Sequence, residues 1–166
     1  MKMIETEPDL ASLVERGGVY HNVRGATVKE FITALIKLLP PVPPADPENL
    51  LKEIMEREAL VSTGVGRGTA LPHPRNPVFS SSGGDGGPLV AVAFPARPLD
   101  WNTQDGSKVH TVFLILSSST KQHLGALSRI NFLCQQEKFH TLLKTQSSQE
   151  TIIAAIREAE TDWQKS

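Results

Sequence analysis

Two apolar runs, residues 89–94 and 109–116, constrain the fold of this chain more than any other feature. In both runs apolar side chains follow one another without regular alternation, which is typical of strands buried on both faces of a sheet. Helical patterns intermix with these strands, so the sequence predicts the α/β class and leaves the strand order open. At 166 residues the chain is long enough for one domain with a core and short for two, so we expect a single domain over 1–166.

Six helices and one further strand are predicted from the remaining segments. Asp9, Thr27 and Asp46 are residue types that cap helix N-termini, and Pro47 suits the first position of a helix. The helices are expected at 9–16, 27–39, 46–58, 119–136, 138–144 and 147–163, and the strand at 19–23. In the helix from 119, Leu124 is expected to face inward. The prolines of 40–44 predict a stiff connector, and the Ser/Gly-rich residues 80–87 predict a flexible loop.

Composition narrows the classes of function. The net charge is −1, so no basic surface for nucleic acid is predicted. The single cysteine, Cys134, excludes an internal disulfide and a cysteine-based metal cluster. Residues 1–5 are too polar for a secretory signal, and no apolar run approaches the roughly 20 residues of a membrane-spanning helix. We therefore expect a cytoplasmic protein without membrane insertion.

The motif that carries most chemistry spans residues 63–75. Three glycines at alternate positions lead into His73, which stands between Pro72 and Pro74. Glycine permits positive φ and lets a ligand approach backbone N–H groups, a run of which can form an anion site. The two prolines favour an extended, non-helical backbone around His73. A neutral imidazole is a nucleophile near pH 7, so the arrangement suits a histidine that accepts a phosphoryl group, although an isolated His-Pro pair would more simply indicate a turn.

Two nucleotide-binding motifs of similar composition do not fit this stretch. A P-loop requires a lysine after its last glycine, and Gly68 is followed by Thr69. A dinucleotide-binding fingerprint opens a helix, whereas a segment with prolines at 72 and 74 cannot open a long one. A nucleotide-binding enzyme is therefore the weakest of the alternatives.

The stretch resembles the phosphorylation-site segment of the fructose/mannitol type of EIIA domain of the phosphotransferase system, a group that includes the stand-alone nitrogen-regulatory EIIA proteins. The family pattern is a glycine-rich approach, a small or aliphatic residue, Pro and the phosphorylated His, often followed by Pro-Arg, as in Leu71-Pro72-His73-Pro74-Arg75. Over about residues 8–160 the resemblance continues with Leu99-Asp100-Trp101, Asp105-Gly106, Val112-Phe113-Leu114, His123-Leu124 and Leu127-Ser128. It implies a single mixed β-sheet flanked by helices on both faces.

Two further site residues are implied by the resemblance. It places the second active-site histidine at His123, in the first turn of a predicted helix, where the helix dipole favours a neutral ring. It also brings Arg57 close to the phosphorylated histidine, where a guanidinium can bind phosphate. From the residues alone, the simpler interpretation of His123 is a half-buried histidine bonded to a backbone carbonyl, and that of Arg57 is a solvated cation at a helix C-terminus, where the dipole favours it.

Other candidate phosphate ligands lie around the glycines. Thr63 would hydrogen-bond a ring nitrogen or a phosphoryl oxygen, or would simply be a turn residue. Gly66 and Gly68 would offer the backbone N–H groups of the loop. Arg75 is close in sequence, but its direction is not predictable, and Arg67 is expected at the rim, where a protein partner docks.

The expected function is that of a phosphocarrier, with His73 and His123 as catalytic residues. By resemblance, the donor is the phosphorylated histidine phosphocarrier HPr or its nitrogen-branch relative, and the acceptor is an EIIB domain or a regulatory target protein. No cofactor or metal ion is expected, because the two histidines lack a third ligand at a spacing recognisable for zinc. The chain has no recognisable EIIB or permease segment, which favours the nitrogen-regulatory branch over sugar transport. The alternative is a regulatory module that docks partners without phosphotransfer.

Overall fold

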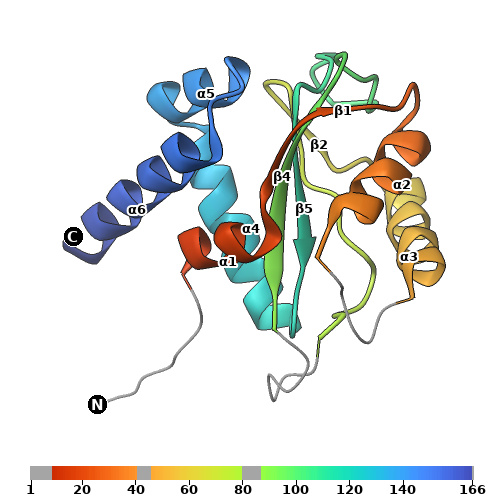
Figure 1. Ribbon diagram of the computed structural model, residues 1–166, viewed down its shortest axis with the longest axis horizontal. Coiled ribbons are helices and arrows are strands. Elements are labelled where there is room, and N and C mark those ends of the chain that lie inside the picture. The colour runs from red at the N-terminus through yellow and green to blue at the C-terminus, as the bar shows by residue number, and fades with distance from the viewer. Residues whose placement is uncertain (1–8, 41–45, 80–86, 166) are drawn as a thin grey trace.

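The computed structural model describes residues 9–40, 46–79 and 87–165, and the predicted connector and Ser/Gly-rich loop lie almost entirely outside them. The elements in chain order are α1 (Leu10–Gly17), β1 (Val19–Val23), α2 (Val28–Leu38), α3 (Pro47–Leu60), β2 (Gly64–Gly66), β3 (Thr69–Ala70), β4 (Leu89–Pro95), β5 (Thr111–Leu116), α4 (Thr120–Cys134), α5 (Glu137–Lys144) and α6 (Gln149–Lys165) (Figure 1). The α/β class is confirmed, and the six expected helices are present with ends shifted by a few residues. Among the described residues, no helix is both long and apolar enough to cross a bilayer.

The five strands form one mixed sheet in the order β1-β4-β5-β3-β2. At its centre β4 and β5 are antiparallel, with Val92 opposite Phe113. Strand β1 runs parallel to β4, β3 runs parallel to β5, and β2 pairs with β3 in antiparallel fashion. Strands β4 and β5 run in opposite directions. The carboxyl ends of the pair β1/β4 and of the pair β3/β5 therefore lie at opposite edges of the sheet, where an edge is the line along which the strands end and not an outer strand.

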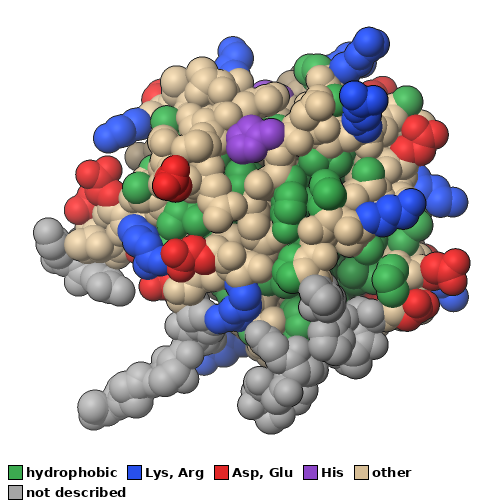
Figure 2. Space-filling model, in the orientation of Figure 1, with side chains coloured by type: hydrophobic (Ala, Val, Ile, Leu, Met, Phe, Trp, Pro, Cys, Tyr) green, Lys and Arg blue, Asp and Glu red, His purple; other side chains and the backbone are tan. Residues whose placement is uncertain are grey.

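Helices cover both faces of the sheet, as its two central strands require. Every residue of β4 and of β5 is buried. Val90, Val92 and Phe94 pack in one core with residues of α1, α4, α5 and α6, whereas Ala91 and Ala93 pack in a second core with residues of α2 and α3. Figure 1 shows these two helical layers on the left and right of the sheet, and Figure 2 shows hydrophobic side chains in the middle of the same face.

The helices begin close to the predicted N-cap residues, but the inward-facing side of α4 was predicted wrongly at Leu124. Ser119 accepts a hydrogen bond from the backbone N–H of Gln122 and caps α4. Leu124, expected inward, is 56% exposed, whereas Gln122 is buried. The reason is that the Gln122 side-chain oxygen accepts a hydrogen bond from the N–H of Ser118 at 3.2 Å, so a polar residue occupies the inward position of the first turn.

Candidate functional site

A cavity of about 170 Å³ lies at the carboxyl ends of β3 and β5. His73 follows β3 closely in the chain, and Ser117 follows β5 directly. The first turn of α4, at the bottom of the view in Figure 1, brings His123 to the same place. The lining residues are Arg57, His73, Pro74, Arg75, Asn76, Pro77, Ser117, Thr120 and His123. The structure thus brings together His73, His123 and Arg57 from three separate parts of the chain.

The backbone before His73 is held at two points. Leu71 donates its N–H to the carbonyl of Thr63 at 3.0 Å, and Ile115 in β5 donates to the carbonyl of Pro72 at 3.1 Å. Pro72 and Pro74 are buried and have no N–H, so the segment follows β5 without continuing the ladder of β3. The sequence prediction of a non-helical segment around His73 is confirmed.

The hydrogen bond to the His73 ring determines which ring nitrogen keeps a free lone pair. Nδ1 lies 3.0 Å from the carbonyl oxygen of Leu71. A carbonyl oxygen only accepts, so in the neutral ring Nδ1 carries the proton and Nε2 keeps the free lone pair. The ring centroids of His73 and His123 lie 4.3 Å apart, with their planes inclined by 49°.

Both rings are held neutral at pH 7. Burial lowers the pKa of His73, and the charge of Arg57 lowers it further, while the bond to Leu71 and the charge of Glu58 act in the opposite direction. Burial, the neighbouring His73 and Arg57 lower the pKa of His123 to about 4. A neutral imidazole has one N–H to donate and one lone pair to offer, so each ring can act as a donor or as a nucleophile.

Arg57 supplies positive charge to the cavity from the last turn of α3. Its Nη1 donates to the carbonyl of Val61 at 2.8 Å, which orients the guanidinium. A guanidinium has five N–H donors, so others remain for an anion in the cavity. Its charge lowers the pKa of His73 and of His123, as expected of a cation close to both rings.

Glu58, which was not predicted from the sequence as a site residue, fixes Thr63 and Trp101 through hydrogen bonds. Its carboxylate accepts hydrogen bonds from the N–H and the hydroxyl of Thr63, both at 2.7 Å, and from Nε1 of Trp101 at 3.0 Å. Thr63 is buried, is bonded in this way to Glu58, and does not line the cavity. The one signal in the sequence is an acidic residue in the last turn of a helix, where the dipole disfavours negative charge.

The glycine-rich stretch forms a hairpin of β2 and β3 where a loop was expected. Gly66 and Gly68 have φ values of +96° and +78°, the left-handed backbone for which glycine is suited. At the turn, the N–H of Arg67 donates to Asp105 and the N–H of Gly68 donates to Ser107. Neither glycine lines the cavity, so a phosphate-binding role for Gly66 and Gly68 stays a prediction.

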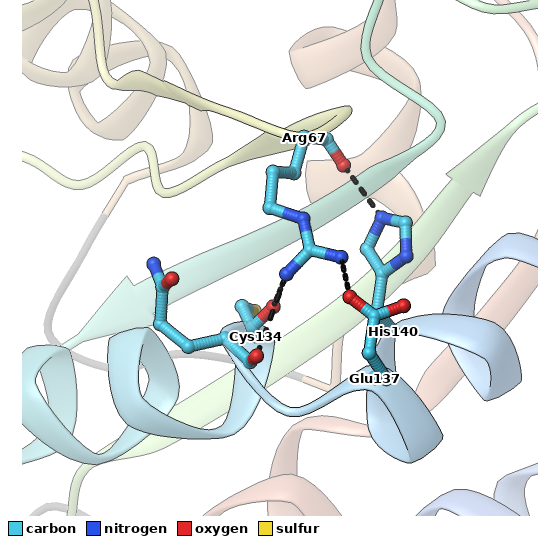
Figure 3. Close-up of polar contacts among 5 residues, drawn as sticks. Arg67, Cys134, Glu137 and His140 are labelled. Carbon is cyan, nitrogen blue, oxygen red and sulfur yellow. Dashed lines mark hydrogen bonds and ion pairs between the residues drawn. The ribbon is translucent and has the colours of Figure 1, made fainter.

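Arg67 connects this hairpin to the helical layer, as Figure 3 shows. Its guanidinium lies 3.4 Å from the carbonyl oxygens of Cys134 and Gln135, at the C-terminal end of α4, and 2.5 Å from the carboxylate of Glu137. The Nε2–H of His140 donates to the carbonyl of Arg67 at 3.0 Å. Arg67 was expected at a rim facing a partner, but its side chain is instead directed at the junction of α4 and α5.

The sequence matches the family model for the "Phosphoenolpyruvate-dependent sugar phosphotransferase system, EIIA 2" over residues 12–159. A nitrogen regulatory protein of Pseudomonas aeruginosa is 26% identical over 150 residues, which are 89% of this chain and 94% of that protein. A fructose-specific EIIABC component of Bacillus subtilis is 26% identical over 152 residues, 90% of this chain. This chain spans only 23% of that longer relative.

The fold is similar to those of solved structures of IIA proteins. The nitrogen regulatory protein IIA-Ntr of Neisseria meningitidis has a TM-score of 0.75 at 24% identity, with 88% of this chain and 97% of that chain covered. The mannitol enzyme IIA of Escherichia coli, solved in complex with phosphorylated enzyme IIB, has a TM-score of 0.65 at 15% identity, with 84% and 94% covered. These likenesses confirm the predicted single mixed sheet with helices on both faces.

Proposed function

The chain belongs to the EIIA type 2 family of the phosphoenolpyruvate-dependent sugar phosphotransferase system, and we propose that it is a phosphocarrier whose His73 accepts the phosphoryl group. The observation that carries this proposal is the pair of neutral rings, His73 and His123, 4.3 Å apart at a cavity that Arg57 also lines. Nucleophile, hydrogen-bond donor and cation are the three groups that phosphoryl transfer to a histidine requires.

In the transfer step, Nε2 of His73 attacks the phosphorus of a donor phosphohistidine in line with the bond that breaks. The new P–N bond forms with the lone pair of Nε2, and the electron pair of the old P–N bond returns to the donor ring. Positive charge develops on the His73 ring, and the Nδ1–H bond to Leu71 stabilises it. The contribution of the protein is therefore positioning and electrostatic stabilisation, the terms that dominate phosphoryl transfer.

His123 and the arginines would bind the transferred oxygens. A neutral His123 donates one N–H to a phosphoryl oxygen without the repulsion that a second positive ring would add beside His73. Arg57 and Arg75 both line the cavity and would neutralise the charge on the phosphoryl group. Site roles for Thr63, Gly66 and Gly68 are indirect in this mechanism, because none of the three lines the cavity.

The partners follow from the family and from the named relatives. The donor would be HPr or its nitrogen-branch relative, and the acceptor an EIIB domain or a regulatory target. The nitrogen regulatory protein of Pseudomonas aeruginosa matches over 94% of its length, which supports the nitrogen branch. The location that goes with these proposed partners is cytoplasmic. The structural likeness to a IIA protein in complex with phosphorylated IIB supports transfer to an EIIB domain.

Phosphorylation of the chain in a reconstituted system tests this function. The protein is incubated with phosphoenolpyruvate, enzyme I and HPr, and phosphoryl uptake is followed by intact mass. We expect one acid-labile, alkali-stable phosphoryl group on the wild type and on His21→Ala, because His21 is exposed and bonds carbonyls of the loop before α6. His73→Ala should take up none.

Two results would contradict this proposal. Uptake of one phosphoryl group by His73→Ala would move the site to another residue. No uptake by the folded wild type from either HPr or its nitrogen-branch relative would favour the alternative, a regulatory module that docks partners without phosphotransfer.

A further inference from the structure

A second and larger cavity lies at the opposite edge of the sheet from His73. It measures about 690 Å³ and is lined by Asn22 near the end of β1, by residues 24–26, which lead towards α2, and by residues 96–99, which follow β4. In Figure 1 the chain leaves β1 at the top of the view, whereas α4 begins at the bottom. No role in phosphoryl transfer to His73 accounts for this cavity.

The topology of the sheet gives the two cavities equivalent positions. Each lies at the carboxyl ends of a pair of parallel strands, β3/β5 for the cavity of His73 and β1/β4 for the larger one. In open α/β sheets, ligands bind outside the carboxyl ends of the strands, where loops diverge and leave a crevice. The proposed phosphate site of His73, His123 and Arg57 lies at the carboxyl ends of β3 and β5, in agreement with this rule. The cavity at the carboxyl ends of β1 and β4 has the corresponding position at the opposite edge.

The larger cavity carries an excess of positive charge. Arg24 comes from one loop and Arg97 from the other, and none of the described residues that line the cavity is acidic. Within the described parts of the chain, neither guanidinium takes part in an ion pair, whereas Arg67 and Arg157 each bond a glutamate.

The surroundings of the cavity carry charges of both signs, with basic residues in the majority. Arg24 also lines an adjoining cavity with Lys29 and Lys37. Glu30, the acidic residue of that region, accepts a hydrogen bond from the N–H of Ala26 at 2.9 Å. Helix α2 begins directly after the loop, so the positive end of its dipole is directed to the same place. Figure 2 shows Lys and Arg side chains, with Asp and Glu side chains among them, at the upper right of the face, on the side where Figure 1 has the start of α2.

We propose that this cavity binds the phosphate group of a small phosphomonoester, with Arg24 and Arg97 as its ligands. A phosphomonoester carries close to two negative charges at neutral pH, which matches two guanidinium groups whose forked donors fit phosphate oxygens. The volume lies in the range of small-molecule sites, roughly 300–1,000 Å³. Ala96, Pro98 and Leu99 provide apolar wall for the organic part of the ligand.

The test is an NMR titration of the full chain, labelled with ¹⁵N, with AMP, glycerol 3-phosphate and inorganic phosphate. Adenosine and glycerol serve as ligands without phosphate. We expect saturable shifts of the amides of residues 22–26 and of those in 96–99, and tighter binding of a phosphomonoester than of inorganic phosphate. The variant Arg24→Ala/Arg97→Ala should weaken binding at least about tenfold, since charge-assisted bonds to phosphate are lost.

A charge-matched variant, Lys52→Ala/Lys108→Ala, is the control. Both lysines are exposed and line neither cavity, so this variant should change affinity less than about twofold by altered long-range charge alone. Equal affinities of both double variants would overturn the proposal, as would shifts confined to residues 73–76 and 117–123. Equal binding of phosphomonoesters and inorganic phosphate would identify free phosphate as the ligand and overturn the assignment. Retained melting temperatures and spectra of the variants show that folding is not the cause.

Discussion

His123 is the residue whose role depends most on its neighbour. Its ring lies beside His73 and its pKa is lowered to about 4, so the ring is neutral at pH 7 and, in the proposed mechanism, donates one N–H. We predict that His123→Ala slows phosphoryl transfer by ~10²–10³, as expected when one well-placed donor to developing charge is lost. His123→Gln should slow transfer less, because the amide keeps an N–H at similar reach. Rapid-quench measurement of uptake from phospho-HPr gives both rates. Wild-type rates in His123→Ala, or loss of folding in both variants, would reduce His123 to a structural residue.

Glu58 combines a structural and an electrostatic effect that two substitutions separate. Glu58→Gln keeps one acceptor for the Thr63 and Trp101 N–H groups, and the Thr63 hydroxyl can turn to accept from the new amide. We predict a nearly unchanged free energy of unfolding and a lower pKa of His73, because the charge of Glu58 raises that pKa. Glu58→Ala should cost about 1–3 kcal/mol for each buried donor left without a partner.

Urea unfolding and NMR titration of the His73 ring measure the two effects. Comparable losses of stability in Glu58→Gln and Glu58→Ala would show that the hydrogen bonds to Thr63 and Trp101 do not depend on an acceptor at this position. An unchanged His73 pKa in Glu58→Gln would remove the electrostatic effect.

At the scale of elements, the β2–β3 hairpin depends on glycine for two separable reasons. Gly68 has a φ of +78°, and a Cβ there would lie 2.3 Å from a ring carbon of His110. Gly106 has a similar φ of +74° but open space around it. We predict that Gly106→Ala costs roughly 1–2 kcal/mol for the left-handed backbone alone. Gly68→Ala should cost more, because the His110 ring must also move. Equal losses in urea unfolding would show that the hairpin accommodates the extra carbon freely.

This hairpin also shows where prediction from sequence stops. The strands β4 and β5 could be predicted because their runs are long and apolar, and the non-helical backbone around His73 because prolines restrict it on both sides. Strands β2 and β3 have three and two residues, too few for a period to be recognised. Glu58 was missed because its partner Trp101 is 43 residues away, and a contact of that range depends on the whole fold.

At the scale of the whole molecule, the half-buried histidines make stability depend on pH. The pKa of His123 is about 4 in the folded protein, against 6.5 for an ordinary histidine. Between these values the unfolded chain binds a proton that the folded chain does not, so the free energy of unfolding falls as pH is lowered from about 6.5 to about 4. Burial lowers the pKa of His73 and His110 as well, and both act in the same direction.

Thermal melting of the wild type and His123→Gln across this pH window measures the effect. The variant should lose less stability than the wild type as pH falls, because one of the protons that drive unfolding is removed. The carboxylates of Asp9 and Asp105, whose pKa values are lowered, titrate below this window and are common to both proteins. Parallel curves for the two proteins would contradict the assigned environment of His123.

The two prolines beside His73 have a consequence for how the site is used repeatedly. Proline restricts the backbone in the unfolded chain as well as in the folded one, so much of the ordering of this segment is completed when the protein folds. A carrier that meets donor and acceptor in turn then needs no renewed ordering of its own reactive segment at each encounter. The entropy lost on docking falls mainly on the partner and on rigid-body motion. Such pre-organisation leaves more of the interaction free energy for docking itself, so in the proposed role even a small contact surface around His73 would be enough for each partner to bind in turn.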